Sequence, residues 1–134
     1  MIVVDTGPIV ALLDRRDSFH DWAREAFARL TPPHATCEPV LAEACHLLGA
    51  KGADAVMALG ERGFLVATFA LAAEWRPVRS LMKRYGNVPM SLADACLVRM
   101  SELDSGSRIM TLDGDFRIYR RHGRHVVPTL SPSE

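Results

Sequence analysis

Short β-type runs of apolar residues alternate along the chain with longer segments in which apolar residues recur at helical spacing. The expected strands are residues 1–4, 35–37, 64–69, 108–112 and 126–127. The expected helices are residues 6–13, 19–30, 39–48, 53–60, 72–85, 92–103 and 116–121. Strands that alternate with helices favour an α/β sandwich with a central, mainly parallel sheet flanked by helices.

Polar residues and glycines mark where several of these elements begin or end. Thr6 is placed to cap the first helix, and Ser91 is placed to cap the helix of residues 92–103. Ser18 begins a segment with the spacing of a capping box for the second helix. The glycines within residues 49–52 predict a turn between the third and fourth helices.

The length and composition indicate one globular domain. The chain has 134 residues, of which 49% are hydrophobic and 24% charged, so a hydrophobic core is available and wholesale disorder is excluded. We expect the domain to cover residues 1–128 and a short polar C-terminal tail to cover residues 129–134. No apolar run reaches the ~18 residues that cross a bilayer, and residues 1–5 lack the basic segment of a signal peptide. We therefore expect a cytoplasmic protein without a membrane partner.

The cysteines give no sign of metal or redox chemistry. Cys37, Cys45 and Cys96 lie far apart in apolar surroundings and form no Cys-x-x-Cys pair. We therefore expect buried, inert thiols.

Charge is balanced over the whole chain but is unevenly distributed. Residues 1–67 carry six basic and nine acidic side chains, a net charge of −3. Residues 68–134 carry ten basic and seven acidic side chains, a net charge of +3. A neutral protein of this kind can hold a basic surface beside an acidic pocket.

Four acidic residues stand out by their positions. Asp5 ends the first strand, Asp113 follows the strand of residues 108–112, and Asp94 lies in the first turn of a helix. In open parallel sheets, ligands bind beyond the carboxyl ends of the strands, so these three belong at that edge. The fourth, Glu43, lies inside an apolar helical segment, where an acid is costly without a partner.

Carboxylates that converge in one cleft must either take up protons or share a cation. Oxygen ligands without Cys or His favour Mg²⁺ or Mn²⁺ over zinc. Such an ion polarises phosphoryl oxygens and lowers the pKa of a bound water, so hydrolysis of a nucleic-acid backbone is the natural chemistry. The structural alternatives are that Asp5 and Asp94 cap helices and that Asp113 forms a turn with Gly114.

Four segments, in order, resemble the motifs of the PIN domain family. Residues 2–14, IVVDTGPIVALLD, look like the start of that domain, and residues 39–48, PVLAEACHLL, are similar to its second motif. Residues 91–95, SLADA, resemble the third motif, and residues 111–116, TLDGDF, the fourth. The match in order and spacing covers the chain from residue 1 to about residue 128. A small member of this kind most resembles the VapC toxins of toxin–antitoxin pairs.

The resemblance implies a PIN-like three-layer sandwich and a metal-dependent ribonuclease. By motif, the residues that would hold Mg²⁺, or Mn²⁺ in its place, are Asp5, Glu43, Asp94 and Asp113. The resemblance further implies that metal-bound water attacks the RNA phosphorus. Asp115 is a fifth acid that could coordinate the ion, bind it through water, or cap a helix.

Thr6 and Thr111 offer hydroxyls beside the expected site. In the family such hydroxyls often position substrate or water, although a helix cap is the first interpretation of Thr6.

Basic residues follow the last acid. Residues 116–125, FRIYRRHGRH, interleave arginines with two aromatic residues. Arg117, Arg120 and Arg121 are candidates for substrate positioning, because guanidinium groups pair with phosphate, and a solvated surface is the alternative. Phe116 and Tyr119 could stack on RNA bases, but facing the core is the favoured interpretation. A second basic set on one face of the helix at residues 72–85 is interpreted as a plain solvated face: Arg76, Arg79, Lys83 and Arg84.

The sequence therefore supports several hypotheses. The first is an endoribonuclease toxin, held in check by a separately encoded antitoxin that covers the acidic cleft and acting as a homodimer, the usual state in the family. Exposed apolar pairs could receive that partner or could equally belong to the core: Phe19, Trp22, Leu47 and Leu48. The second is a housekeeping nuclease for RNA processing. The third is a catalytically silent PIN-like module that binds RNA or protein.

Overall fold

The computed structural model describes residues 1–132 of the chain. The strands of the main sheet are β1 (Ile2–Val4), β2 (His34–Thr36), β3 (Leu65–Ala67), β4 (Arg108–Met110) and β7 (Thr129–Leu130). The helices are α1 (Thr6–Leu13), α2 (His20–Ala28), α3 (Glu38–Glu61), α4 (Trp75–Arg84) and α5 (Leu92–Leu103). Two short 3₁₀ helices, at Leu71–Ala73 and Gly114–Arg117, and a hairpin of β5 (Arg120–Arg121) and β6 (His125–Val126) complete the described fold.

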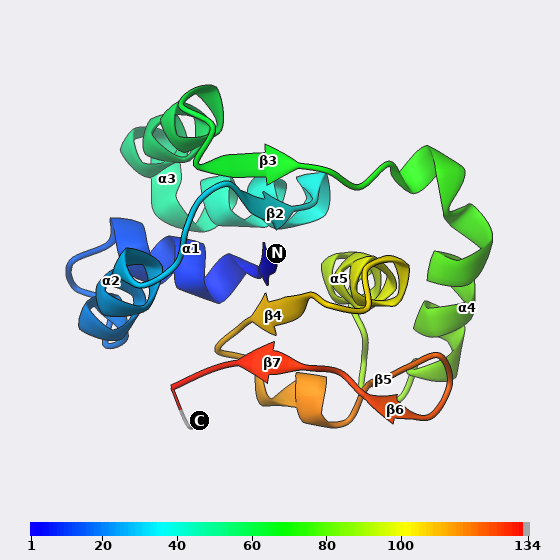
Figure 1. The fold of residues 1–134 in the computed structure, drawn as a ribbon. Coiled ribbons are helices and arrows are strands. Elements are labelled where there is room, and N and C mark those ends of the chain that lie inside the picture. Colours follow the sequence, from blue (N-terminus) through cyan, green and yellow to red (C-terminus); the bar gives the residue numbers. More distant parts are fainter. Residues whose placement is uncertain (133–134) are drawn as a thin grey trace.

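The main sheet is parallel, with strand order β3-β2-β1-β4-β7 (Figure 1). β1 is the central strand: Val3 is opposite Ala35 of β2 on one side and Ile109 of β4 on the other. Because parallel neighbours end at the same edge, the carboxyl ends of β1 and β4 lie side by side. The backbone N–H of Asp5 donates to the carbonyl of Met110, with 3.0 Å between the atoms, and joins the two ends.

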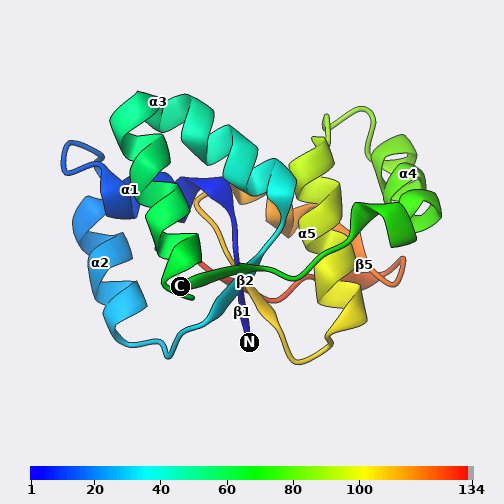
Figure 2. The same cartoon turned by 90° about the horizontal axis from the view of Figure 1, so that it is seen from above.

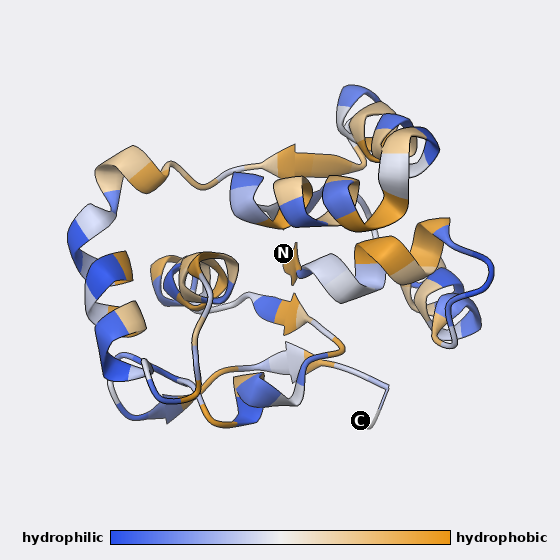
Figure 3. Cartoon of the chain, turned by 180° about the vertical axis from the view of Figure 1, so that it is seen from behind, coloured by the Kyte–Doolittle hydropathy of each residue, from blue (hydrophilic) through white to orange (hydrophobic). Residues whose placement is uncertain are grey.

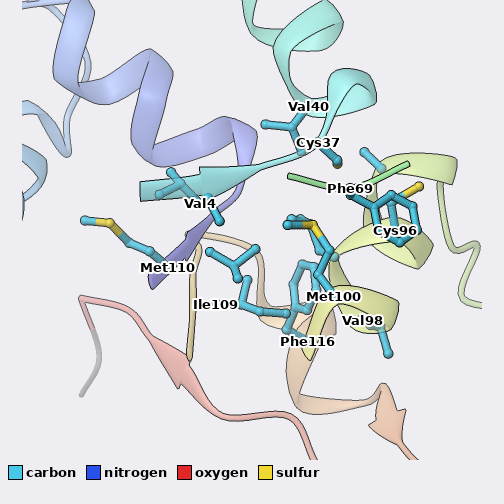
Figure 4. Close-up of a cluster of buried hydrophobic side chains, with 14 of the residues drawn as sticks. Val4, Cys37, Val40, Phe69, Cys96, Val98, Met100, Ile109, Met110 and Phe116 are labelled. Carbon is cyan, nitrogen blue, oxygen red and sulfur yellow. The ribbon is translucent and has the colours of Figure 1, made fainter. Parts of the chain in front are cut away.

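Helices cover both faces of the sheet and give the expected three layers. Seen from above, α1, α2 and α3 lie on one side of the strands, and α5 and α4 lie on the other (Figure 2). The core between the layers is formed by buried side chains from the strands and both helical layers (Figure 4). Val4, Ile109 and Met110 from the strands are fully buried, as is Cys96 from α5. Core packing therefore fixes the strand ends from which the acidic residues project.

The helix starts differ from two of our predictions. Asp5 rather than Thr6 is the N-cap of α1, and its side chain accepts from the backbone N–H of Thr6. Ser18 does not cap α2, since the preceding loop is held by Asp17, whose Oδ1 accepts from the backbone N–H of Phe19. Ser91 caps α5 as predicted, with its Oγ accepting from the backbone N–H of Asp94.

The turn predicted at residues 49–52 is a kink at one residue. Gly49 has φ of 73°, a conformation that side-chain-bearing residues rarely adopt, and the chain resumes helical geometry up to Glu61. α3 is consequently two helical segments joined at Gly49. The first segment carries Glu43 toward the carboxyl edge of the sheet, and the second packs beside the edge strand β3.

The C-terminal part of the described chain departs furthest from expectation. The helix predicted at residues 116–121 is replaced by the 3₁₀ helix and by β5, because the chain turns back at His122 and Gly123, both with positive φ. The strand expected at residues 126–127 begins one residue earlier, as β6, and pairs in the hairpin instead of the main sheet. Residues 129–130, expected in the polar tail, form β7 and pair with β4. The last two residues of that expected tail, 133–134, lie outside the described part.

All three cysteines are free, and Cys37 and Cys96 are buried as expected, whereas Cys45 is half-buried. Among residues 1–132, no helix is both long enough and apolar enough to cross a membrane.

Candidate active site

A pocket of about 640 Å³ opens at the carboxyl ends of β1 and β4. Its walls come from the N-terminal ends of α1 and α5, from α3, and from the loop before α2. The acidic residues that line it are Asp5, Asp17, Glu43, Asp94, Asp113 and Asp115. No lysine, arginine or histidine within the described residues lines this pocket. The structure therefore brings all five sequence-predicted acids together in a cavity whose described lining residues include no positive side chain.

Asp5 lies deepest, directly after β1, and is only 7% exposed. Its Oδ1 accepts from the backbone N–H of Thr6 at 2.7 Å, and its Oδ2 accepts from the hydroxyl of Thr111 at 2.7 Å. The pKa of Asp5 is raised to about 6, mainly by burial and in smaller part by the nearby charges of Asp94 and Asp113, while the two hydrogen bonds oppose the shift. The pocket thus holds one carboxyl group whose ionised form is costly near neutral pH.

Asp94 lies in the first turn of α5, where Ser91 fixes the start of the helix. Its Oδ2 accepts a hydrogen bond from the hydroxyl of Tyr119, with 2.8 Å between the oxygens. Burial raises the pKa of Asp94, the hydrogen bond from Tyr119 lowers it, and the charge of Asp113 raises it. Asp94 and Asp113 therefore lie close enough to repel each other.

Asp113 and Asp115 both follow β4. The side chain of Asp113 caps the short 3₁₀ helix, since its Oδ1 accepts from the backbone N–H of Asp115 at 2.9 Å. The backbone N–H of Asp113 donates to the hydroxyl of Thr111 at 2.9 Å. Asp115 does not cap the 3₁₀ helix, because Asp113 does so. Asp115 lines the pocket.

Glu43 is not in the apolar setting that its sequence neighbours suggested. Val40 and Ala44 of α3 are fully buried, whereas Glu43 is exposed and lines the pocket. The helix turns its apolar face to the core and leaves Glu43 at the edge of the cavity. An acid here needs no buried partner, so our argument from the cost of burial was wrong even though the residue does line the pocket.

Of the two threonines, only Thr6 lines the acidic pocket, whereas Thr111 lines the adjoining cavity. Thr6 lines the cavity, and its buried Oγ1 has no hydrogen-bond partner within the described residues. Thr111 is buried behind Asp5 and connects its carboxylate to the backbone of Asp113. Thr111 therefore positions Asp5.

The three predicted arginines do not line the acidic pocket. Arg117 lines an adjoining cavity of about 260 Å³, which shares Phe19 and Asp113 with the acidic one. Nη1 of Arg120 donates to backbone carbonyls of the preceding turn, at Arg117, Ile118 and Tyr119. Nη1 of Arg121 donates to the carbonyl of Ser101 in the last turn of α5 and to that of Ser105 just after the helix. Arg120 and Arg121 therefore hold the hairpin in place.

Sequence reasoning missed two residues of the site. Asp17 lines the pocket from the loop before α2, where only a cluster of charged residues marks it in the sequence. Tyr119 and Phe116 are buried, which confirms that these aromatic rings face the core, but the contact of the Tyr119 hydroxyl with Asp94 was not predicted. Nothing in the local pattern indicates that contact, because the partners are 25 residues apart.

The donor set fits a hard divalent cation. It consists of oxygen atoms, and it has a net negative charge without a basic residue among the described lining residues. The charges of Asp94 and Asp113 raise the pKa of Asp5, and the charge of Asp113 raises the pKa of Asp94. Within residues 1–132, however, no three Asp, Glu, His or Cys side chains are placed closely enough to hold a metal ion by themselves. Mutual repulsion favours this spread, and Mg²⁺ typically uses only one or two carboxylates and keeps several of its waters.

Comparison with known proteins agrees with the fold. The PIN domain family model matches residues 2–121, so the chain belongs to the PIN domain family. Among solved structures, the chain is similar to Mycobacterium tuberculosis VapC20, described as a toxin that cleaves the sarcin–ricin loop, with a TM-score of 0.80 and 24% sequence identity. That match covers 96% of this chain and 100% of the other. Comparison with curated proteins gives no match.

Proposed function

We propose that this protein is a metal-dependent endoribonuclease that uses Mg²⁺, with Mn²⁺ as a substitute. The observation that carries the proposal is the pocket with six carboxylates and no basic side chain among its described lining residues, at the carboxyl edge of the sheet in a PIN domain. Asp5, Glu43, Asp94 and Asp113 are the proposed ligands, with Asp115 as a fifth candidate. Bound there, the ion would supply Lewis-acid stabilisation of the charge that develops on a phosphoryl group during hydrolysis.

The residues of the chain prepare the site before any ligand arrives. Thr111 and the backbone N–H of Thr6 hold both oxygens of Asp5, and Tyr119 holds one oxygen of Asp94. These bonds fix the direction of each carboxylate, so little reorganisation is needed on binding. The buried hydroxyl of Thr6 has no hydrogen-bond partner within the described residues, so its side chain would have to rotate to donate to a phosphoryl oxygen or a water in the pocket.

RNA cleavage by the purified protein tests the proposal directly. Reactions contain Mg²⁺, Mn²⁺ or EDTA, and the Asp94→Asn variant is assayed beside the unaltered protein. We expect cleavage that requires the ion and disappears in the variant. Cleavage that survives both EDTA and the substitution would come from a contaminant and would overturn the assignment.

We further propose that the protein is the toxin of a toxin–antitoxin pair. The similar M. tuberculosis structure is described as a toxin, and Phe19 and Leu47 expose apolar surface at 41% and 60% while lining the acidic pocket. Trp22 and Leu48, the other candidates for a partner surface, pack against the core. A separately encoded antitoxin that covers the pocket would contact Phe19 and Leu47 and block access to the carboxylates.

A growth assay and a mass measurement test this second step. Induction of the unaltered gene should arrest growth, Asp94→Asn should not, and co-expression of the proposed, separately encoded antitoxin should restore growth. A nuclease whose induction leaves growth unchanged would be the housekeeping enzyme, and intact metal binding without cleavage would favour the silent module. We also propose a homodimer, which light scattering of the purified protein would measure.

A further inference from the structure

The outer side of α4 carries an unbroken set of positive charges. Within Trp75–Arg84, WRPVRSLMKR, four residues are basic and none is acidic. The basic residues of this α4 basic face are Arg76, Arg79, Lys83 and Arg84, and all are exposed. Val78 and Leu81 are buried on the opposite side, so helical geometry places the charges toward solvent. Figure 3 shows α4 at the edge of the molecule with hydrophilic residues along its outer side.

No acidic side chain among residues 1–132 forms an ion pair with the α4 basic face. Arg76, Arg79 and Lys83 form no ion pair within residues 1–132. Arg84 does not meet a carboxylate either, since its Nη2 donates to the carbonyl of Gly123 in the β5–β6 hairpin at 2.6 Å. Arg124, next to Gly123 in that turn, is also exposed and extends the positive surface. The surface therefore retains its full charge for a partner.

A short stretch of chain connects this face to the acidic pocket. α4 ends at Arg84, and the loop that follows places Pro89 and Ser91 in the lining of the pocket. Tyr85 anchors the junction, since its buried ring packs against the ring of Tyr119 at 5.2 Å between centroids. Tyr119 in turn contacts Asp94. The positive face and the acidic pocket are thus held at a fixed relative position.

The proposed reaction requires a negatively charged substrate to approach a negatively charged pocket. An RNA backbone is a polyanion, and a pocket lined by carboxylates without a lysine or arginine among its described residues repels it. Positive charge must therefore come from elsewhere on the molecule, beyond the ion itself. None of the three arginines predicted to supply it lines the acidic pocket: Arg117 lines the adjoining cavity, and Arg120 and Arg121 anchor the hairpin.

Resting on the proposed ribonuclease function, we propose that the α4 basic face binds the phosphate backbone of the RNA substrate beside the cleavage pocket. Contacts with phosphate carry no sequence information and give affinity that falls with salt. The face thus supplies affinity and orientation, while the pocket and its rim would select the position that is cleaved.

Two matched pairs of substitutions test this role. Arg79→Gln/Lys83→Gln removes two charges from the α4 basic face, and Lys51→Gln/Arg62→Gln removes two exposed charges from α3 and its C-terminal end. The probe is a fluorescein-labelled RNA hairpin, bound in EDTA across a range of salt concentrations. The same titration with polyglutamate distinguishes RNA from an acidic polypeptide as the partner. Circular dichroism verifies that both variants fold.

We expect the α4 variant to bind the hairpin about tenfold more weakly, and its plot of log K against log salt to be shallower by about 1.5. The α3 variant should match the unaltered protein. Equal RNA binding by all three proteins, equal losses in both variants, or a loss confined to polyglutamate would each overturn the inference. If the protein cleaves no RNA but its RNA binding depends on the α4 basic face, the inference stands and the nuclease assignment is overturned. If the protein cleaves RNA but its RNA binding does not depend on this face, the nuclease assignment stands and the inference is overturned.

Discussion

The hydroxyl of Tyr119 donates to Oδ2 of Asp94 across 2.8 Å, from a ring that is fully buried. The ring is held edge-on by Phe116 and Tyr85, with 5.2 Å between the centroids in both pairs. The carboxylate of Asp94, a proposed metal ligand, is therefore oriented by a tyrosine whose own position is fixed by core packing. The carboxylate of Asp94 is also hydrogen-bonded by the side chain and the backbone of Ser91, the N-cap of α5.

Replacing Tyr119 with Phe tests this arrangement, since it removes the hydroxyl and keeps the ring. We expect kcat on RNA to fall about tenfold with KM little changed, because a hydrogen bond to a charged group contributes roughly 1.5–3 kcal/mol. Affinity for Mn²⁺, followed by electron paramagnetic resonance, should fall as well. Tyr85→Phe is the matched control, because its buried hydroxyl accepts from the backbone N–H of Arg120 instead. Equal losses of activity in both variants would make the role of Tyr119 purely structural.

The raised pKa of Asp5 makes this residue costly for folding at neutral pH. Its pKa is about 6 in the folded protein and 3.8 in an ordinary side chain, so the folded protein holds this proton more tightly than the unfolded chain. The stability that this proton contributes is therefore fully present below pH 3.8 and is lost as pH rises through 6. We expect Asp5→Asn to increase the free energy of unfolding by about 1–3 kcal/mol at pH 7.5 in EDTA, measured with urea. The gain should shrink toward pH 4. A variant that is less stable at both pH values would contradict this account of the pocket.

Divalent cations should stabilise the folded protein, because they relieve the repulsion among the carboxylates. We expect millimolar Mg²⁺ or Mn²⁺ to raise Tm by about 3–6 °C, measured by calorimetry, which corresponds to a ligand present at several times its Kd. The shift should be much smaller in Asp94→Asn and unchanged in Asp54→Asn, whose exposed carboxyl lies on α3 away from the pocket. A Tm that stays constant at millimolar Mg²⁺ and Mn²⁺ would contradict the proposed metal site.

Thr111 can be tested with two substitutions of similar size. Thr111→Val removes the hydroxyl that donates to Asp5 and accepts from the backbone N–H of Asp113, and Thr111→Ser keeps it. Because that hydrogen bond lowers the pKa of Asp5, the Val variant should raise this pKa further and move the acid limb of the activity profile to higher pH. We expect Thr111→Val to lose about 1–2 kcal/mol of stability and Thr111→Ser to retain the profile. Identical pH profiles in the two variants would exclude the contact.

His34 gives stability the opposite dependence on pH. Burial lowers its pKa below 6.5, and neither ring nitrogen has a hydrogen-bond partner within the described residues. The unfolded chain therefore binds more protons, and this residue makes the free energy of unfolding fall as pH drops below 6.5. We expect His34→Leu to flatten the change between pH 7 and pH 5 in urea titrations, whereas His122→Gln, on the exposed hairpin turn, should leave it unaltered. If the free energy of unfolding of His34→Leu still falls between pH 7 and pH 5, another residue causes that dependence.

The sequence predicted the elements that apolar spacing alone determines. α5 with its Ser91 cap, the parallel order of strands and helices, and the acids at strand ends all follow from local pattern and from the geometry of parallel sheets. The hairpin of β5 and β6 could not be predicted in this way, because its backbone is held by long-range bonds such as that of Arg84 to Gly123. The strand β7 is too short and too polar to carry a signal without its partner β4.

Some residues of the site could likewise be predicted from local pattern, and others could not. Asp5, Asp94 and Asp113 lie at positions that a sheet edge dictates, so their convergence could be expected. The exposure of Glu43 could not, because it depends on which way α3 is rotated against the core. The use of Arg120 and Arg121 as anchors for the hairpin likewise depends on carbonyl groups that only the tertiary fold brings near.

The hydrogen bond from Thr111 to Asp5 spans 106 residues of sequence. The central strand that leads to Asp5 is synthesised first, yet its neighbour β4 and the hydroxyl that orients Asp5 come near the end of translation. A nascent chain still on the ribosome therefore carries an incomplete pocket until almost all of the domain has emerged. For the proposed ribonuclease, this order of assembly delays completion of the acidic pocket until β4 and Thr111 have been synthesised.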